Sequence, residues 1–161
     1  MAMIGAAVLL ACGVAIAEAV DCDSTPPCYG TPEDDEIDGT LDTETIYAYG
    51  GDDHVYADGV KNSPIEGWGD DTVYGSSGDD DLQGEGGSDT VYGGGGRDLI
   101  QAATNDTAGS TDYSYGGGGD DTIDAVDDKV DIINCGKGSK DFVQYDADLD
   151  TIKGCEIKSP L

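Results

Sequence analysis

Aliphatic residues recur along this chain at intervals of nine positions, each standing two residues after an acidic residue. Val73 follows Asp71 in this way, and Leu82 follows Asp80. A glycine usually precedes the acidic residue by two positions, and polar or aromatic residues flank the aliphatic one. Because side chains alternate between the two faces of a strand, the aliphatic residue of each three-residue segment points inward and its neighbours point outward. The pattern predicts an all-β chain of very short strands and glycine-rich turns.

The periodic segment follows the consensus Gly-Gly-x-Gly-x-Asp-x-aliphatic-x, which residues 93–101 and 116–124 match completely. Near-copies place aspartates at positions 35, 53, 71, 80 and 89, with a degenerate copy at residues 62–64. After Asp98 the phase slips through an inserted loop at about residues 102–111, and it resumes at Asp112 and Asp121. Tandem repetition of this kind predicts a solenoid, in which each repeat packs on its neighbours.

These repeats resemble the RTX, or haemolysin-type, calcium-binding nonapeptide repeat family, most strongly over residues 35–124. The resemblance implies a right-handed parallel β-roll, a two-sided β-solenoid in which each turn spans two nonapeptides and has two glycine-rich loops and two short strands. It also implies that several Ca²⁺ ions are held between successive loops.

The residue types in the repeat suit calcium chemistry. Glycine permits positive φ, so carbonyl oxygens can turn towards one point, and aspartate adds an anionic oxygen. Calcium takes about 6 to 8 oxygen ligands, which two stacked loops can supply. The expected metal ligands are Asp35, Asp53, Asp71, Asp80, Asp89, Asp98, Asp112 and Asp121. The acidic residues expected to shape the loops or lie on the surface instead are Asp52, Asp70, Asp79 and Asp120.

Composition explains why bound ions matter. The 161 residues include 35 Asp and Glu against 7 Lys and Arg, a net charge of −28, and 37% of them are hydrophobic. Low hydrophobicity with high net charge would by itself predict disorder, so ions and disulfides must contribute the missing stability. The same charge argues against nucleic acid or an anionic membrane as a partner, because both would be repelled.

Four cysteines beyond Ala19 lie near the ends of the chain: Cys22, Cys28, Cys135 and Cys155. An even number in an exported chain predicts two disulfides, with three possible pairings. We expect Cys22–Cys28 and Cys135–Cys155, since each would close one end of the solenoid locally. Residues 20–34 then form an N-terminal cap, and residues 125–161 combine degenerate repeats with a C-terminal disulfide cap.

The segment 1–19 is rich in small and apolar side chains and ends in Ala17-Glu18-Ala19, which predicts a signal peptide and a mature start at Val20. A retained apolar N-terminus is one alternative. Lipidation at Cys12 is another, because Leu9-Leu10-Ala11-Cys12 resembles a bacterial lipobox. The segment favours export, so the expected location is outside the cell or at its surface.

Tyr56, Tyr74 and Tyr92 recur at every second repeat and are expected to stack as a ladder on one face. Strand preference and cross-strand pairing explain such a ladder simply, and the functional alternative is an interaction face for another subunit or a carbohydrate. His54 has no nucleophile motif to pair with, so we expect a surface histidine and no enzymatic activity.

These features predict an exported calcium-binding β-roll that folds on binding calcium and has a structural role at the cell surface or in the extracellular matrix. One alternative is a subunit of a calcium-dependent, self-assembling extracellular filament. Another is a surface adhesin or carbohydrate binder. The expected partners are calcium ions and, in the filament alternative, further copies of the chain.

Overall fold

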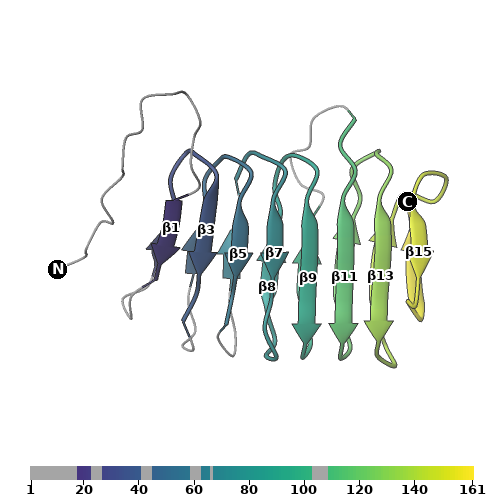
Figure 1. Cartoon of the computed structure of the whole chain (residues 1–161). Coiled ribbons are helices and arrows are strands. Elements are labelled where there is room, and N and C mark those ends of the chain that lie inside the picture. Colours follow the sequence, from purple (N-terminus) through teal and green to yellow (C-terminus); the bar gives the residue numbers. More distant parts are fainter. Residues whose placement is uncertain (1–17, 23–26, 41–44, 59–62, 66, 103–108) are drawn as a thin grey trace.

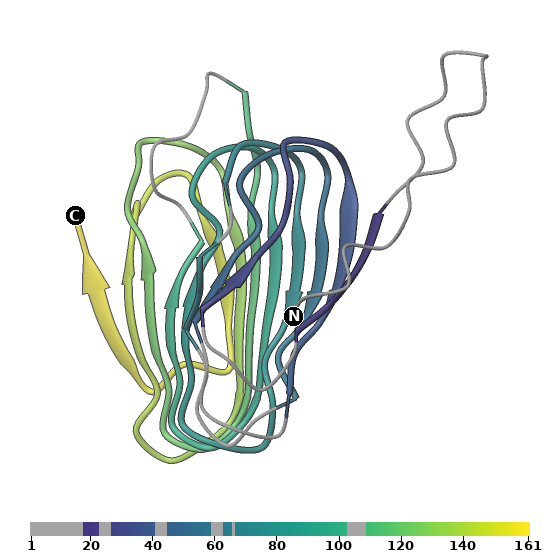
Figure 2. The same ribbon diagram turned by 90° about the vertical axis from the view of Figure 1, so that its left-hand side faces the viewer.

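The computed structural model describes residues 18–22, 27–40, 45–58, 63–65, 67–102 and 109–161. Within these ranges the chain forms strands and turns, and no helix there is long and apolar enough to cross a membrane. The strands belong to two eight-stranded parallel sheets, A and B, which form the two sides of a solenoid (Figure 1, Figure 2). The predicted all-β parallel solenoid is therefore confirmed.

Strands of one sheet alternate with strands of the other along the chain. Sheet A contains β1 (Glu18–Asp21), β3 (Asp35–Asp38), β5 (His54–Tyr56), β7 (Thr72–Tyr74), β9 (Thr90–Gly95), β11 (Tyr113–Gly118), β13 (Ile132–Lys137) and β15 (Thr151–Lys153). Sheet B contains β2 (Cys28–Tyr29), β4 (Thr45–Tyr47), β6 (Ser63–Ile65), β8 (Asp81–Gln83), β10 (Leu99–Gln101), β12 (Thr122–Ala125), β14 (Phe142–Tyr145) and β16 (Ile157–Pro160). The solenoid thus grows along one axis, from β1 to β15 in sheet A (Figure 1).

The register of both sheets repeats the period of the sequence. In sheet A, Val55 pairs with Val73, and Val73 pairs with Val91. In sheet B, Leu82 pairs with Ile100. The partners of each pair are separated by two nonapeptide repeats, so equivalent positions of the repeat lie directly beside each other in successive turns.

One turn is longer than the others. Val91 pairs with Ser114 and Ile100 pairs with Ile123, so 23 residues separate equivalent positions here instead of 18. The extra residues fall between β10 and β11, where the sequence predicts an inserted loop; residues 103–108 of that loop lie outside the described ranges. Because the register resumes afterwards, the insertion lengthens one turn without ending the solenoid.

The core consists of two facing columns of side chains, one column from each sheet. The central residues of the strands are buried at 0–1% exposure: Ile37, Val55, Val73, Val91 and Ile133 from sheet A, and Ile46, Leu82, Ile100, Ile123 and Val143 from sheet B. Residues of the two columns pack in common clusters, which confirms the inward direction predicted for the aliphatic residue. Burial of each such side chain contributes about 1.5–3 kcal/mol, so this narrow core is the main apolar stabilisation of the fold.

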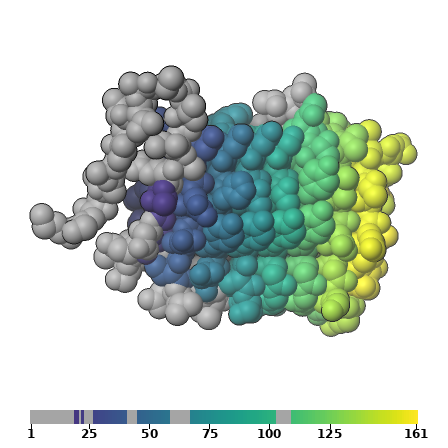
Figure 3. All heavy atoms as spheres, viewed as in Figure 1, coloured from purple at the N-terminus to yellow at the C-terminus, as the bar shows by residue number. Residues whose placement is uncertain are grey.

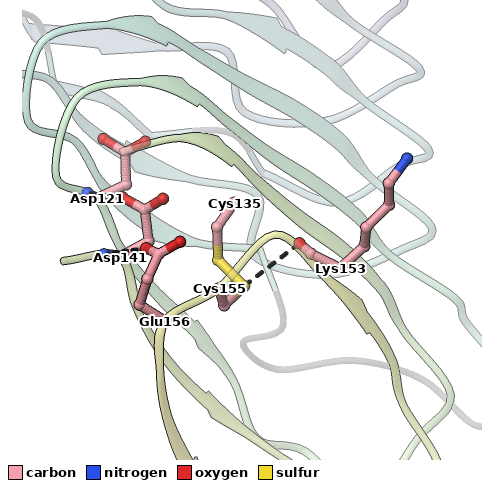
Figure 4. The surroundings of a disulfide bond; sticks show 6 residues. All are labelled: Asp121, Cys135, Asp141, Lys153, Cys155 and Glu156. Atoms are coloured by element: carbon pink, nitrogen blue, oxygen red, sulfur yellow. Dashed lines mark hydrogen bonds between the residues drawn. A yellow bond between two sulfur atoms is a disulfide. The ribbon is translucent and has the colours of Figure 1, made fainter. Parts of the chain in front are cut away.

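Both predicted disulfides are present. Cys22–Cys28 lies beside β1 and β2, with Cα atoms 5.4 Å apart. Cys135–Cys155 joins β13 to the segment after β15, with Cα atoms 5.2 Å apart (Figure 4). Cys135–Cys155 links neighbouring turns at the C-terminal end, and Cys22–Cys28 links the ends of two successive strands at the N-terminal end, as expected for disulfide-closed ends.

The N-terminal segment is described only from Glu18 onward. β1 begins at Glu18, ahead of the predicted mature start at Val20, and pairs in parallel with β3. The rest of the predicted signal segment, including Cys12, lies outside the described residues. The cleavage site and the boundaries of the caps stay predictions.

Candidate metal sites

The predicted metal ligands all occupy the same place in the turn, directly before or at the start of a strand. All eight are buried, with exposures of 0–3%. They form two rows, because successive repeats belong alternately to the two sheets. Row A, beside sheet A, contains Asp35, Asp53, Asp71, Asp89 and Asp112, and row B, beside sheet B, contains Asp80, Asp98 and Asp121.

In row A, one carboxylate oxygen of each aspartate after Asp35 accepts a hydrogen bond from the backbone N–H of the aspartate one turn earlier. The N–H of Asp35 donates to Oδ1 of Asp53 at 2.8 Å, and the N–H of Asp53 donates to Oδ1 of Asp71 at 2.8 Å. Asp71 donates in turn to Asp89 at 3.0 Å, and Asp89 to Asp112 at 2.8 Å. Oδ1 therefore links each turn to the previous one.

Row B follows the same rule. The N–H of Asp80 donates to Oδ1 of Asp98 at 2.9 Å, and the N–H of Asp98 donates to Oδ1 of Asp121 at 2.9 Å. Aspartates two repeats apart in the sequence are thus in direct contact, through a backbone group of one and a carboxylate of the other.

Both rows extend beyond the residues predicted from the sequence. Row A continues to Asp131 and Asp150, and row B continues to Asp141, whose N–H donates to Oε2 of Glu156 at 3.1 Å (Figure 4). Because residues 125–161 lack most of the repeat glycines, the sequence predicted a cap of degenerate repeats there. The available signal was the retained Asp-x-aliphatic rhythm, as in Asp131-Ile132-Ile133.

A second, outer set of acidic residues binds the backbone in the opposite direction along the solenoid. The N–H of Asp52 donates to Oδ1 of Asp34 at 2.9 Å, and the N–H of Asp70 donates to Oδ1 of Asp52 at 3.0 Å. The pKa of the exposed Asp120 carboxyl is lowered, chiefly because the backbone N–H of Ser139 donates to it. These carboxylates fit the interpretation that the outer residues shape the loops.

The second oxygen of the inner carboxylates differs from the first. Oδ2 is buried and has no hydrogen-bond partner in Asp53, Asp71, Asp98, Asp121 and Asp141. A buried, charged oxygen without a partner is strongly unfavourable, and native structures rarely keep one unless an ion or water completes it. The rows therefore present a series of anionic oxygens available to a cation.

Glycines leave the space beside these oxygens. A Cβ atom at Gly93 would lie 2.5 Å from Oδ2 of Asp98 and 2.5 Å from the carbonyl oxygen of Gly116 in the next turn. Gly84 has the same relation to Oδ2 of Asp89, at 2.5 Å. Only a residue without a side chain thus lets a carboxylate oxygen and a carbonyl oxygen of the neighbouring turn approach the same point.

The electrostatics of the rows also favour a bound cation. Burial raises the pKa of Asp53 and of Asp98 to about 7 and that of Asp71 to about 6, from 3.8, and neighbouring carboxylates add to the rise. For Asp98 the neighbours that contribute are Asp121 first, then Asp80. A nearby positive charge acts in the opposite direction and favours the ionised form.

The donor set fits calcium. Among the described residues, no three Asp, Glu, His or Cys side chains converge as a metal-binding cluster, so a cation would also need backbone oxygens. Buried carboxylate oxygens with carbonyl oxygens of adjacent turns form an all-oxygen set, which a hard cation such as Ca²⁺ prefers. The single histidine, His54, is exposed on β5, as expected.

The predicted tyrosine ladder lies on the outward face of sheet A. The ring centroids of Tyr56 and Tyr74 are 5.0 Å apart, and those of Tyr74 and Tyr92 are 4.9 Å apart, with interplanar angles of 3°. Tyr115 extends the ladder at 4.8 Å. Sequence reasoning missed Tyr115 because the inserted loop separates it from Tyr92 by more than the regular two repeats.

A parallel β-solenoid whose glycine-rich turns stack buried carboxylates defines a calcium-binding β-roll. The model of the RTX calcium-binding nonapeptide repeat matches residues 29–62, 67–100 and 106–125, more than half of the chain, in four copies. The chain belongs to this family, whose repeats bind several Ca²⁺ ions per array. Comparison with curated proteins and with solved structures gave no match.

Proposed function

We propose that this protein is an exported, non-enzymatic β-roll that folds when it binds several Ca²⁺ ions and has a structural role at the cell surface or in the extracellular matrix. The observation that carries the proposal is the pair of buried aspartate rows, in which Oδ1 is hydrogen-bonded and Oδ2 of five residues has no partner. These rows place negative charge in the interior of the fold, and a bound cation would neutralise part of that charge.

The proposed ligands are the eight predicted aspartates, with Asp131 and Asp141 as further candidates in the extended rows. Asp53, Asp71, Asp98, Asp121 and Asp141 would offer Oδ2 to calcium while Oδ1 keeps its bond to the backbone one turn earlier. In Asp35 and Asp80, Oδ2 also accepts a backbone hydrogen bond from Thr31 and Ser76, respectively. Backbone oxygens beside the turn glycines, such as the carbonyl of Gly116, would complete the set. Calcium supplies positive charge between turns, and the chain supplies the fixed spacing of the donors.

Export is supported by the apolar N-terminal segment and by the two disulfides, because disulfides persist in oxidising compartments. Extracellular calcium sites have dissociation constants of about 10⁻⁴ to 10⁻³ M. Sites of that strength would be empty at the low calcium level inside a cell and filled outside it. Folding would then begin after export, when the chain meets calcium.

The test is a calcium titration of the full oxidised chain, starting in excess chelator and followed by far-UV circular dichroism and by size-exclusion chromatography with light scattering. We expect an expanded chain in chelator and a compact β-roll in millimolar calcium. Magnesium is the matched control, because it prefers octahedral, largely hydrated sites and should not replace calcium at equal concentration. A full β spectrum in chelator that calcium leaves unchanged would overturn the proposal.

A further inference from the structure

The central strands of sheet A carry no outward carboxylate, although Glu36 and Asp38 are exposed on the neighbouring strand β3. The outward residues of the central strands β5, β7, β9, β11 and β13 are His54, Tyr56, Thr72, Tyr74, Thr90, Tyr92, Tyr113, Tyr115, Ile132 and Asn134, here called the tyrosine face. None is acidic, although 35 of the 161 residues of the chain are. On sheet B, Asp81 and Asp124 occupy outward positions of β8 and β12. The central strands of sheet A therefore differ in charge from β3 at their N-terminal side and from sheet B.

The tyrosine face is regular as well as uncharged. The four stacked rings follow one another at 4.8–5.0 Å, the spacing of the strands that carry them. Next to this ridge runs a second row, in which the small side chains of Thr72 and Thr90 lie between the larger His54 and Tyr113. Figure 3, in the same view as Figure 1, shows side chains in continuous rows across successive strands. The face thus combines a ridge of tyrosines with a second row that is lower at its centre, at Thr72 and Thr90, and both rows have the strand period.

The stacked rings present their edges and hydroxyl groups to a partner. Because each ring lies nearly parallel to the next, with interplanar angles of 3° to 9°, the ring faces within the ladder cover one another. Stacking of a sugar ring on an aromatic face is therefore blocked along the ladder. A suitable partner must instead be uncharged, elongated and periodic at about 4.8 Å in order to fit ridge against row.

We propose that a second copy of this chain docks on the tyrosine face, so that two calcium-loaded rolls pack sheet A against sheet A. The same face of another copy has the required period and lacks carboxylates. Other sides of a copy bring carboxylates, such as Asp81 and Asp124, against the partner. An isologous contact of this kind places Tyr74 and Tyr92 of each roll against Thr72 and Thr90 of the other, as in the packing of two aligned sheets. The proposal rests on calcium folding the roll and lowering its negative charge.

The size of the face sets the expected strength. Five strands about 4.8 Å apart, each three to six residues wide, offer a few hundred Å² per copy, below the roughly 800 Å² per partner of a stable complex. The dimer is therefore expected to be weak and concentration-dependent. Such a contact becomes effective where exported copies are crowded at a surface.

The test is sedimentation velocity of the full chain in millimolar calcium over a wide range of protein concentration. Thr90→Glu adds one charge to the tyrosine face without removing a ring, and Gln101→Glu adds the same charge at an outward position of β10 on sheet B. Tyr74→Glu is the more severe variant at the centre of the ladder. Circular dichroism in calcium checks that each variant folds.

We expect the wild type and Gln101→Glu to form dimers alike, with the dissociation constant of Thr90→Glu raised at least tenfold. A folded wild type that stays monomeric at the highest concentration would overturn the docking proposal and leave calcium-dependent folding intact. Equal weakening by Thr90→Glu and Gln101→Glu would also overturn it, as would open-ended assembly that Thr90→Glu does not affect. Failure of the proposed function is distinguishable, because the wild type would then show no spectral response to calcium.

Discussion

Substitution of alanine for Gly93 tests most directly whether the turn glycines leave the space that calcium needs beside the aspartate Oδ2 atoms, here called the glycine cradle. A Cβ atom at this position would lie 2.5 Å from Oδ2 of Asp98 and 2.5 Å from the carbonyl oxygen of Gly116. Both distances fall about 1 Å short of the optimal separation of about 3.5 Å. The carbonyl of Gly116 belongs to a paired strand, so the Asp98 side chain has to move, and its Oδ2 then leaves the position proposed for calcium.

The expected magnitude follows from the cost of this overlap. Forcing an extra methyl group into a packed site costs about 1–3 kcal/mol. Since 1.4 kcal/mol is a factor of ten in an equilibrium constant, calcium binding beside Gly93 should weaken by about fivefold to about a hundredfold. The calcium midpoint of folding, measured by far-UV circular dichroism from excess chelator, should rise accordingly.

Gly95→Ala is the matched control in the same turn. Its Cβ atom would meet only the carbonyl oxygen of Gly118, at an ordinary 3.7 Å. Neither Gly93 nor Gly95 has a positive φ, so both variants gain the same backbone restriction, which stabilises a compatible site by about 0.4–1 kcal/mol. The calcium midpoint of Gly95→Ala should therefore stay unchanged or fall. Equal midpoints for the two variants would refute the cradle.

Three further predictions concern the carboxylates and the C-terminal end. Asp53→Asn removes a buried charge, so this variant should show more β structure than the wild type in chelator at pH 8 yet need several-fold more calcium to fold fully; a lower calcium midpoint would contradict its role as a ligand. The pKa values of Asp53 and Asp98 are about 7 in the fold, against 3.8 as the ordinary value, so the calcium-free roll binds extra protons. In chelator, β structure should therefore increase as the pH falls from 8 to 5 and disappear as it rises through about 7; the opposite trend in circular dichroism would contradict the burial of these carboxyls. Replacing Cys135 and Cys155 together by alanine opens a cross-link with a sequence separation of 20 and should lower the free energy of urea unfolding in calcium by about 3 kcal/mol; an unchanged urea midpoint would show that this end is held without the disulfide.

The sequence was sufficient to predict the architecture because local and long-range order share one period. A residue such as Val73 is both the centre of a strand and the neighbour of Val55 and Val91 in the adjacent turns, so a single repeat specifies the register as well. The two disulfides and the inward direction of the aliphatic residues followed from the same arrangement.

The extent of the aspartate rows could not be predicted, because it depends on the path of the backbone. Turns of 19 and 20 residues still place Asp131 and Asp141 in hydrogen-bond contact with the preceding row members, although their glycine pattern is degraded. Tyr115 was missed because the inserted loop places it 23 positions after Tyr92, although the two tyrosines pair in the structure.

The choice of aspartate itself argues for a cation from solution. An asparagine would accept the backbone hydrogen bond at Oδ1 equally well without placing a charge in the core. The hydrogen bonds along the two aspartate rows therefore do not by themselves explain why these residues are acidic. Ion pairs of the described residues, Arg97–Asp79 and Lys129–Asp127, involve carboxylates outside the two rows. With 7 basic residues for 35 acidic ones, the chain cannot neutralise the rows internally. Above the raised pKa of these carboxyls, a buried carboxylate oxygen repeated turn after turn beside a glycine is stabilised when a cation binds there, and this couples the fold to its metal.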